Sequence, residues 1–428
     1  MGWCFETDPE FQAQLDWMAQ FVRDEIEPLD ILFRGPGDHC DPKAEIPRAI
    51  MRPLQQVVRD KGLWACHLGP ELGGQGFGQV KLALMNEILG RSRFAPTVFG
   101  TQAPDTGNAE IIARFGTEAQ KRQYLQPLLD GEIASSFSMT EPHAGADPGE
   151  FRCRAVLDGD EWVLEGEKWF SSHANFADFL ITIAITDPSV PVHSGSSAFI
   201  VPRNAPGLEM VRNIAVGPKD VIGSGVHPYV RYNQCRIPKD NLLGPEGGGF
   251  MVAQSRLGGG RIHHAMRTIG ILNKALDMMC TRALSRVTKG EPLAQKQMVQ
   301  ERIADSYTQV LQFRLHVLYA AWLFDRDGGY SHPVRREISA VKAAMPGVLK
   351  DVIYRSLHLH GSLGMSNETQ LMDMWQMVPE MGIVDGPTEV HKVSVAKSVL
   401  REHAPYEGLF PPYHTPAILA AAKEKYRD

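Results

Sequence analysis

The sequence predicts an α+β protein in which a β-rich middle region separates two helical regions. In the first and last thirds of the chain, apolar residues recur at three- and four-residue steps, the period of one helix face. Between residues 135 and 249, short runs of Ile, Phe and Val alternate with prolines and glycines, as in strands and turns. The 428 residues are enough for two or three domains with a large apolar core.

The first region, residues 1–134, is expected to be an all-α domain. Asp8 is a cap candidate that precedes a proline at the first helical position. Apolar residues between positions 11 and 26 then share one helix face. Further helical patterns cover residues 54–64, 82–89, 108–115 and 120–129, the last of them interrupted by Pro127.

The middle region, residues 135–248, is expected to be a β domain. Residues 151–156 and 161–164 read as short strands, and Asp158-Gly159 between them is a hairpin turn signal. Residues 179–185 and 197–201 are rich in Ile, Phe and Val, which favours two more strands.

Helical periodicity returns in residues 249–404. Five apolar residues from Ile269 to Leu284 share one helix face, and longer helical patterns follow at 298–324, 339–360 and 390–400. The tail, residues 405–428, is rich in proline and then contains a short alanine-rich helix candidate.

Composition and charge exclude several functions. The net charge of −6 and the pI of about 6.2 argue against non-specific nucleic-acid binding, which needs a basic surface. The six cysteines show no CxxC spacing, so we expect neither a zinc site nor a redox dithiol, and no metal. No apolar run approaches the roughly 18 residues of a transmembrane helix, and the acidic N-terminus does not resemble a signal peptide. We therefore expect a soluble intracellular protein, cytoplasmic if its source is bacterial.

Two segments carry hydroxyl and aromatic groups suited to a flat ligand. Residues 137–147 (FSMTEPHAGAD) read as a strand end that runs into a turn, where backbone N–H groups and the Thr140 hydroxyl could bind a heterocycle. Residues 166–172 (GEKWFSS) place two aromatic residues beside two hydroxyls. From the residues alone, a plain strand and turn and a buried aromatic pair remain alternatives.

A third segment, residues 256–264 (RLGGGRIHH), is expected immediately before the first C-terminal helix. Glycines allow a backbone to approach a ligand closely, and a helix N-terminus beside an arginine favours anions. A flexible hinge is the alternative.

These segments, in this order, resemble the acyl-CoA dehydrogenase family. Residues 139–147 are similar to its MTEPxAGSD signature, 166–172 to GxKxWITN, and 384–391 (VDGPTEVH) to YEGTSxIQ. Residues 286–297 and 358–365 resemble its R-x-x-F-G-x-x-L-x-x-x-Q and QxxGGxG(F/Y) stretches. The resemblance covers nearly the whole chain. It implies an N-terminal helical domain, a central β-barrel-like domain and a C-terminal four-helix bundle.

The resemblance implies FAD as cofactor and an acyl-CoA as substrate. Phe170 takes the position of a Trp that flanks the flavin ring, and Ser172 that of a Thr near flavin N5. The implied cofactor contacts are Phe137, Met139, Thr140, Phe170, Ser171, Ser172, Arg286, Gln297, His358, Gly361, Ser362, Pro387 and Glu389. The implied substrate contacts are Gly145, Ala146, Gly258, Gly259, Gly260, Arg261 and Gly386. In the family, the Arg and Gln matching Arg286 and Gln297 bind FAD across a subunit interface, which implies a homodimer or homotetramer.

Asp385 aligns with the family's catalytic Glu, and the branch with the GRIHH motif carries Asp-Gly-Pro here. A base must remove the weakly acidic proton α to a thioester from one face, while flavin accepts a hydride from the other. Aspartate is one methylene shorter than glutamate, about 1.5 Å of reach. Its backbone or the acyl chain must therefore come closer. Without the resemblance, Asp385-Gly386 would read as a turn.

Three functions remain open on this fold. The first is a dehydrogenase that passes electrons to an electron-transfer flavoprotein. The second is an oxidase that uses O₂, acting on an acyl-CoA or like nitroalkane oxidases, which also use an aspartate base. The third is a non-redox acyl-CoA-binding protein or a lyase. The segment Gly258–Arg261 favours a CoA ligand, and the carboxylate at Asp385 speaks against the third function.

Overall fold

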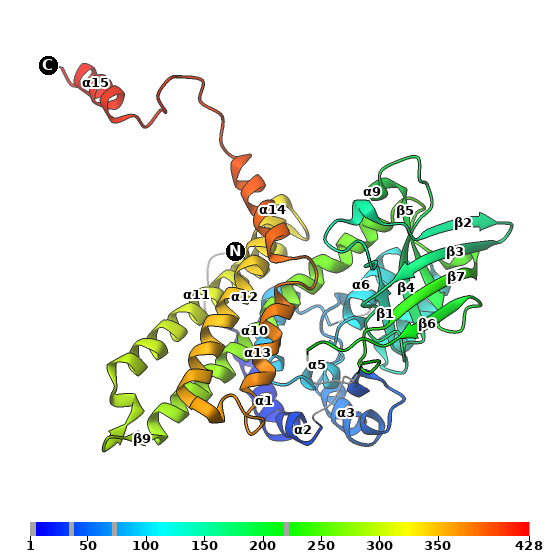
Figure 1. Ribbon diagram of the computed structural model, residues 1–428, viewed down its shortest axis with the longest axis horizontal. Helices are drawn as coiled ribbons and strands as arrows, with labels where there is room; N and C mark the ends of the chain where they lie inside the picture. The colour runs from blue at the N-terminus through cyan, green and yellow to red at the C-terminus, as the bar shows by residue number, and fades with distance from the viewer. Residues whose placement is uncertain (1–5, 34–37, 71–74, 218–221, 428) are drawn as a thin grey trace.

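The computed structural model describes residues 6–33, 38–70, 75–217 and 222–427. A helical N-terminal part, a central sheet and a C-terminal set of long helices follow one another along the chain (Figure 1). The predicted α+β fold is confirmed. In the part of the chain described, no helix is long and apolar enough to cross a membrane.

The N-terminal helices contribute to two apolar cores: buried residues between positions 11 and 99 share one, and those between 109 and 128 pack in the other with the sheet. Asp8 caps the first helix by accepting a hydrogen bond from the Phe11 N–H, as expected of a capping residue. Pro127 does not end its helix, because it stands in the first turn of α8, where its missing N–H costs nothing. The helices are α1 (Pro9–Phe21), α2 (Glu27–Leu32), α3 (Arg52–Asp60), α4 (Gly78–Leu89), α5 (Ala95–Val98), α6 (Asp105–Phe115), α7 (Glu118–Gln120) and α8 (Gln126–Leu129).

The central strands form one mixed sheet in the order β6-β7-β3-β2-β4-β5-β8, with β1 parallel to β4. The turn at Asp158-Gly159 joins β2 and β3 as predicted, whereas β6 and β7 were not assigned as individual strands from the sequence. The strands are β1 (Ser135–Ser138), β2 (Arg154–Asp158), β3 (Glu161–Lys168), β4 (Phe179–Ile185), β5 (Ser196–Pro202), β6 (Leu208–Arg212), β7 (Tyr229–Pro238) and β8 (Leu242–Leu243), with the short helix α9 (Val192–Gly195) before β5.

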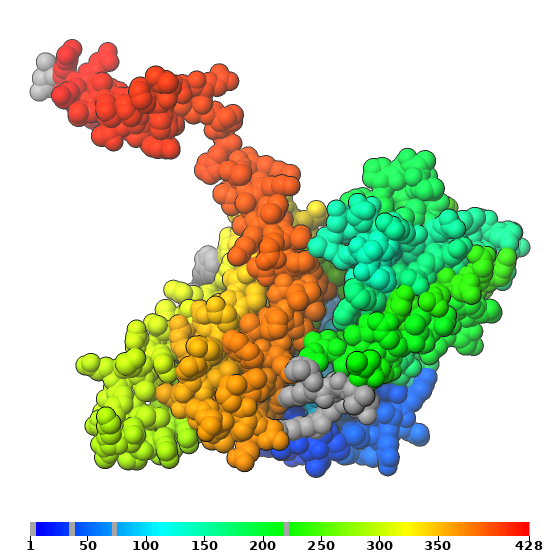
Figure 2. Space-filling view, viewed as in Figure 1, coloured from blue at the N-terminus to red at the C-terminus, as the bar shows by residue number. Residues whose placement is uncertain are grey.

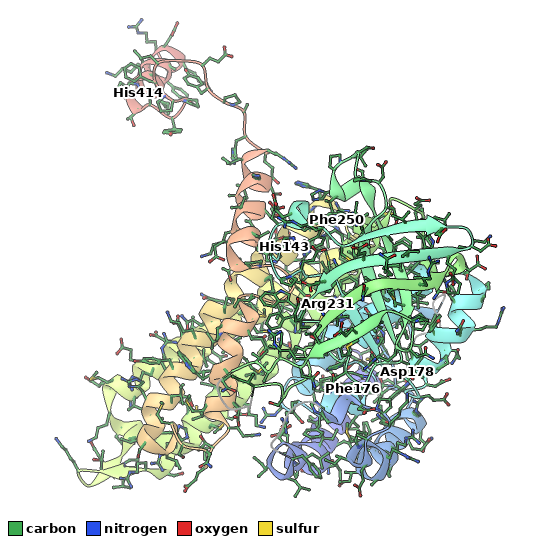
Figure 3. The ribbon with its side chains drawn as sticks, turned by 45° about the vertical axis from the view of Figure 1, so that its right-hand side comes forward. His143, Phe176, Asp178, Arg231, Phe250 and His414 are labelled. Atoms are coloured by element: carbon green, nitrogen blue, oxygen red, sulfur yellow. The ribbon has the colours of Figure 1, made fainter. Side chains whose placement is uncertain are left out.

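Strand β4 is apolar except for Thr182, because it is covered on both faces. Phe179, Ile181 and Ile183 pack in a core with residues of α6, while Leu180 and Ala184 face a second core inside the sheet. Lys43 Nζ forms an ion pair with Asp178 Oδ1 at 2.5 Å, at the edge of the sheet that faces the N-terminal helices (Figure 3). The sheet is thus joined to the first helical region by packing and by this ion pair.

The C-terminal region consists of long helices packed around a core that includes Ile269, Val317 and Leu349. The helix α13 was not predicted from the sequence. The elements are α10 (Gly249–Ser285), α11 (Gln297–Asp327), α12 (His332–His360), α13 (Leu371–Met381), α14 (Thr388–Leu400) and α15 (Thr415–Lys425), with the small hairpin of β9 (Val287–Thr288) and β10 (Glu291–Pro292) between α10 and α11. The tail that carries α15 stands off the rest of the molecule (Figure 2).

One sequence expectation is wrong. Gly258, Gly259, Gly260 and Arg261 do not precede the first C-terminal helix but lie inside α10, which begins at Gly249. No helix N-terminus is therefore available at Arg261 to bind an anion. Packing of neighbouring segments against the three glycines explains how the helix tolerates them.

Candidate active site

Asp385 lies in the turn between α13 and α14 with a left-handed backbone, φ 54°. Its carbonyl oxygen accepts a hydrogen bond from Arg261 Nε at 2.8 Å and lies 3.3 Å from His391 Nε2. Aspartate is among the few residues that enter this region at modest cost. The next residue, Gly386, has φ 108°, and a Cβ there would meet His391 Nε2 at 2.9 Å. The Arg261 and His391 side chains therefore hold the main chain of Asp385 in place.

The Asp385 carboxylate rests on the backbone of α10. A Cβ added at Gly260 would lie only 2.8 Å from Asp385 Oδ2, so the carboxylate occupies the space that any other residue would fill. His264 Nε2, one turn further along α10, lies 3.6 Å from the same oxygen. The side chain of Asp385 keeps 16% of its surface exposed. The position is thus largely enclosed but open on one side.

A different side chain packs against each of the three glycines in α10. A Cβ at Gly258 would meet the Tyr330 ring at 2.5 Å, and one at Gly259 would meet Glu110 Oε2 at 2.8 Å. With Asp385 at Gly260, three segments far apart in the sequence converge on one stretch of helix. Glycine costs about 1 kcal/mol relative to alanine inside a helix. Here it permits this close approach.

Buried positive charge surrounds the Asp385 carboxylate. Arg256, Arg261 and Lys342 are all close enough to interact with it electrostatically. Burial lowers the pKa of Lys342 to about 8, an effect that Asp385 opposes, and the ammonium donates a hydrogen bond to the Met381 carbonyl. Removing charge from water is costly unless it is paired. Asp385 therefore brings a carboxylate next to three buried cations.

The two histidines beside Asp385 are neutral near pH 7. Burial lowers the pKa of both His264 and His391 to about 4, and the Asp385 carboxylate only partly offsets this. A neutral imidazole can donate one hydrogen bond and accept another. His264 and His391 can therefore orient Asp385 without adding charge.

Arg256 joins this region of α10 to the sheet. Its guanidinium lies over the Phe137 ring at 4.1 Å, and its Nε donates to Asn108 Oδ1 at 2.9 Å. Phe137 belongs to β1 and is one of the cofactor contacts predicted from the sequence. The structure thus connects the predicted cofactor strand to α10, the helix against which the Asp385 carboxylate rests.

A buried ion pair fixes the turn that follows β1. Lys168 Nζ binds Glu141 Oε1 at 2.8 Å and the Met139 carbonyl at 2.8 Å, and both charged side chains are essentially inaccessible. Glu141 also accepts hydrogen bonds from the backbone N–H groups of Arg152 and Cys153. Thr140 is held through its carbonyl, whereas Gly145 and Ala146 are exposed at the end of the turn.

The loop after β3 presents an aromatic ring and the Ser172 hydroxyl, while the adjacent Ser171 is buried. Phe170 has a left-handed φ of 49° and leaves 43% of its surface exposed, although the loop around it is packed. Ser171 Oγ lies 2.9 Å from Ser138 Oγ, and Ser172 Oγ lies 2.8 Å from His227 Nδ1. An exposed aromatic face beside a hydroxyl is the kind of surface that a flat heterocycle covers. These residues fit a flavin ring.

The remaining predicted cofactor residues fall into two places. Pro387 caps α14 and the exposed Glu389 lies in its first turn, close to Asp385 in the chain. Arg286 follows the last residue of α10, and Gln297 begins α11, beyond the β9 hairpin at the end of the helices away from the sheet (Figure 1). Twenty-five residues of helix separate Arg286 from Arg261, about 38 Å.

His358, Gly361 and Ser362 lie near that far end of α10. Leu359, beside His358, packs with Met279, Ala283 and Val299. Within one chain, the structure therefore does not bring Arg286, Gln297 and the His358–Ser362 turn to Asp385. It divides the predicted cofactor residues into two separate groups.

Several residues of the site carry no sequence motif. Lys342, Glu110 and Tyr330 are far from Asp385 in the chain and meet it or its neighbours only in the fold. The available signal was weak: Lys342 is a charged residue within a largely apolar stretch of helix, whereas Glu110 lies in a helix with other polar residues. His227 and His391 gave no such signal, since a lone histidine more often has a packing role.

Three successive parts of the chain match models of one family. These are the N-terminal domain of the acyl-CoA dehydrogenases over residues 8–132, the middle domain over 136–224 and the C-terminal domain over 247–400. The Mycobacterium tuberculosis protein FadE2, described as a probable acyl-CoA dehydrogenase, is 40% identical over 86% of this chain and 88% of its own length. Acyl-CoA dehydrogenase family member 11 of Rattus norvegicus is 36% identical over 92% of this chain, which spans only 51% of that relative.

Solved structures agree with these matches. A Mycobacterium abscessus structure described as an acyl-CoA dehydrogenase superposes with a TM-score of 0.84 at 35% identity, over 94% of this chain and all of that one. Glutaryl-coenzyme A dehydrogenase in complex with glutaryl-CoA gives a TM-score of 0.79 at 25% identity, over 94% of this chain and 98% of that one. The chain therefore belongs to the acyl-CoA dehydrogenase family of flavin-dependent oxidoreductases.

Proposed function

We propose that the protein dehydrogenates an acyl-CoA thioester to the trans-2-enoyl-CoA, with Asp385 as the base that removes the α proton. The observation that carries the proposal is the Asp385 carboxylate itself. It is mounted on a backbone held by Arg261 and His391 and is surrounded by buried cations. A base of this kind acts only if it is held within hydrogen-bond reach of its proton.

The setting of Asp385 compensates for its short side chain. The left-handed turn and the space above Gly260 bring the carboxylate against α10, where a larger residue would exclude it. Nearby Arg256, Arg261 and Lys342 place positive charge around this carboxylate. As the carboxylate takes the proton, negative charge develops on the thioester, and fixed dipoles such as the Gly386 N–H would stabilise it.

The residues around Phe137 and Phe170 would hold the flavin ring of FAD. Met139, Thr140, Ser171 and Ser172 would supply hydrogen bonds and packing at its edge, with Pro387 and Glu389 nearby on α14. When bound, FAD supplies the acceptor for the hydride from the β carbon. The aromatic face, the hydroxyls and the ion-paired turn after β1 support this placement.

The second group of cofactor residues would serve a neighbouring copy of the chain. Arg286 and Gln297, with the turn of His358, Gly361 and Ser362, would bind the diphosphate and adenosine end of FAD held by another subunit. Their distance from Arg261 along α10 supports this division. The active protein would then be a homodimer or homotetramer. An arginine fork suits a diphosphate.

The CoA part of the substrate would pass the exposed Gly145 and Ala146 and the surface of α10 near Gly258–Arg261. In that segment, Gly258 and Gly259 are already covered by Tyr330 and Glu110. The substrate would therefore meet these two side chains rather than the glycine backbone itself. Arg261 acts at least in part on the base, through its hydrogen bond to the Asp385 carbonyl.

Anaerobic titration of the FAD-loaded protein with acyl-CoAs of graded chain length tests the reaction. We expect the flavin absorbance to bleach with the preferred substrate. Asp385→Ala should keep FAD and slow the bleaching by about 10²- to 10⁴-fold, the usual contribution of a general base. Asp16→Ala, at an exposed carboxyl on α1, should leave the rate unchanged. Normal flavin reduction by Asp385→Ala would place the base elsewhere, and no bleaching with any acyl-CoA would exclude a dehydrogenase.

Reoxidation of the reduced protein identifies the electron acceptor. We propose an electron-transfer flavoprotein, so turnover in air without it should be slow. Peroxide formed in air at the rate of substrate oxidation would instead assign an acyl-CoA oxidase.

A further inference from the structure

Ser172 and His227 form a side-chain hydrogen bond between two loops at the edge of the sheet. Ser172 Oγ lies 2.8 Å from His227 Nδ1. Two main-chain hydrogen bonds flank this pair: the Ser171 N–H donates to the Pro228 carbonyl, and the His173 N–H donates to the Val226 carbonyl. The backbone register of the two loops thus sets the imidazole opposite the hydroxyl.

This hydrogen bond limits what the Ser172 hydroxyl can do. A serine hydroxyl has one hydrogen and rotates freely unless a partner holds it. The adjacent hydroxyl, on Ser171, already bonds Ser138 in a buried chain that continues to Tyr232. His227 therefore decides which way the hydrogen of Ser172 points, and which hydrogen bond is left for a ligand beside the exposed face of Phe170.

His227 is suited to this task because it is neutral near pH 7. Burial lowers its pKa below the usual value for histidine. The titratable groups on neighbouring segments that interact with this cluster are His173 and, through it, His39, and burial lowers their pKa values to about 3 and 4. A neutral imidazole offers either a donor or an acceptor at Nδ1, whereas a charged one could only donate.

We propose that His227 is a positioning residue for the reaction: it orients the Ser172 hydroxyl toward flavin N5 and so shifts the equilibrium between oxidised and reduced flavin. The proposal rests on the proposed function, because Ser172 is assigned to flavin N5 by resemblance to the family. Nothing in the family motifs assigns a role to His227. The role follows from the geometry, in which His227 Nδ1 lies 2.8 Å from Ser172 Oγ.

A double-mutant cycle tests whether His227 acts through Ser172. The midpoint potential and visible spectrum of bound FAD would be measured in the wild type, His227→Leu, Ser172→Ala and the double variant. One hydrogen bond is worth up to about a tenfold change in an equilibrium constant. That corresponds to roughly 30 mV for a two-electron couple. We expect His227→Leu to shift the potential by about this amount in the wild-type background and not in the Ser172→Ala background.

Two further variants separate positioning from a general structural effect. His227→Asn places an amide near the position of Nδ1 and should restore most of the potential. His414→Leu makes the same change as His227→Leu on the tail, where His414 stacks on Phe410 (Figure 3), and should change neither potential nor spectrum. If a variant binds FAD too weakly for potentiometry, the cycle is measured on the FAD dissociation constants of all four proteins.

The inference and the proposed function fail in different ways. Equal shifts in both backgrounds, or no shift in either, would overturn the role of His227 while the acyl-CoA reaction stands. Coupling between His227 and Ser172 without bleaching by any acyl-CoA would overturn the proposed function alone. A wild-type protein that binds no FAD would overturn both.

Discussion

The two ends of helix α10 differ in how far side chains of the same chain cover them. Around Gly258–Arg261, the same chain supplies Tyr330, Glu110 and Asp385, which fill the space above each glycine. At the other end, the side chains next to Arg286 and Gln297 are open to solvent: Leu284, Val287 and Met298 leave more than half of their surface exposed. Large apolar side chains that gather on a surface mark a place where something else binds.

This difference indicates which parts of the reaction one chain can provide. The proposed base, Asp385, is held by side chains of its own chain: Arg261, His264 and His391. The far end offers an arginine, an amide and an exposed apolar rim, but it lies about 38 Å from Arg261. Substitutions near Asp385 should therefore act within a subunit, and those at Arg286 should act on a neighbour.

Mixed oligomers give the largest expected effect, because activity appears from two inactive parents. Copies carrying Asp385→Ala and copies carrying Arg286→Ala would be co-expressed with different tags and purified as hybrids. If Arg286 binds the FAD of its neighbour, one site of each hybrid dimer has both residues intact. At limiting FAD, we expect about half of the wild-type rate per dimer, since dimer symmetry makes two equivalent sites.

The reciprocal hybrid is the control. It pairs a wild-type copy with a copy that carries both substitutions. Cross-subunit binding leaves this hybrid with no intact site, whereas binding within one chain leaves it with one. Activity in the reciprocal hybrid and none in the first would contradict the division of the site.

Gly260→Ala gives the next largest expected effect. It tests the end of α10 where the Asp385 carboxylate packs against Gly260. Its Cβ would come within 2.8 Å of Asp385 Oδ2, so the carboxylate must move. A displacement of about 1 Å can cost about 10²-fold in rate. We expect a loss of that size in the anaerobic rate of flavin reduction, with FAD retained.

Gly347→Ala is the matched control for Gly260→Ala. Gly347 also lies inside a long helix, α12, and has open space around its Cβ position. This substitution should leave the rate unchanged and stabilise the protein by up to about 1 kcal/mol. Equal rates in both variants would show that the contact between Asp385 and Gly260 does not position the base.

The glycine triplet also shows where prediction from sequence stops. A run of three glycines is expected to end or precede a helix, since each disfavours helix relative to alanine. The helix continues because Tyr330, Glu110 and Asp385 pack into the gaps, and that packing is visible only in three dimensions. Local composition was a better guide for β4, because its run rich in Ile and Phe was predicted as a strand at the same residues as in the structure.

The same limit applies to the site. Asp385 could be assigned from the sequence because its motif is local, and Ser172 could be assigned from a short run of neighbouring residues. Lys342 and His227 could not be predicted, because each meets its partner only where segments far apart in the sequence come together. Strand β7 was missed for a different reason. Polar residues separate its buried residues, so the strand contains no continuous apolar run that would identify it in the sequence.

The smallest expected effect comes from Glu110, which packs against Gly259 in α10. It is tested through the pH dependence of the protein's stability. Burial raises the pKa of its carboxyl to about 7, although Arg114 and Arg256 oppose the rise. The folded protein therefore holds this proton more tightly than the unfolded chain between about pH 4.5 and 7, and stability falls as pH rises through that window. Glu110→Gln stays neutral, so its unfolding free energy relative to wild type should increase on the order of 2 kcal/mol from pH 4.5 to 7.5.

Urea unfolding at a series of pH values measures this difference. Glu118→Gln, at an exposed glutamate one helix further along the chain, serves as the matched substitution and should show no comparable trend. A constant difference between Glu110→Gln and wild type across the range would mean that Glu110 is already ionised in the folded state. The carboxylate above Gly259 would then carry a full charge beside Asp385, and the surrounding cations would have to balance two carboxylates instead of one.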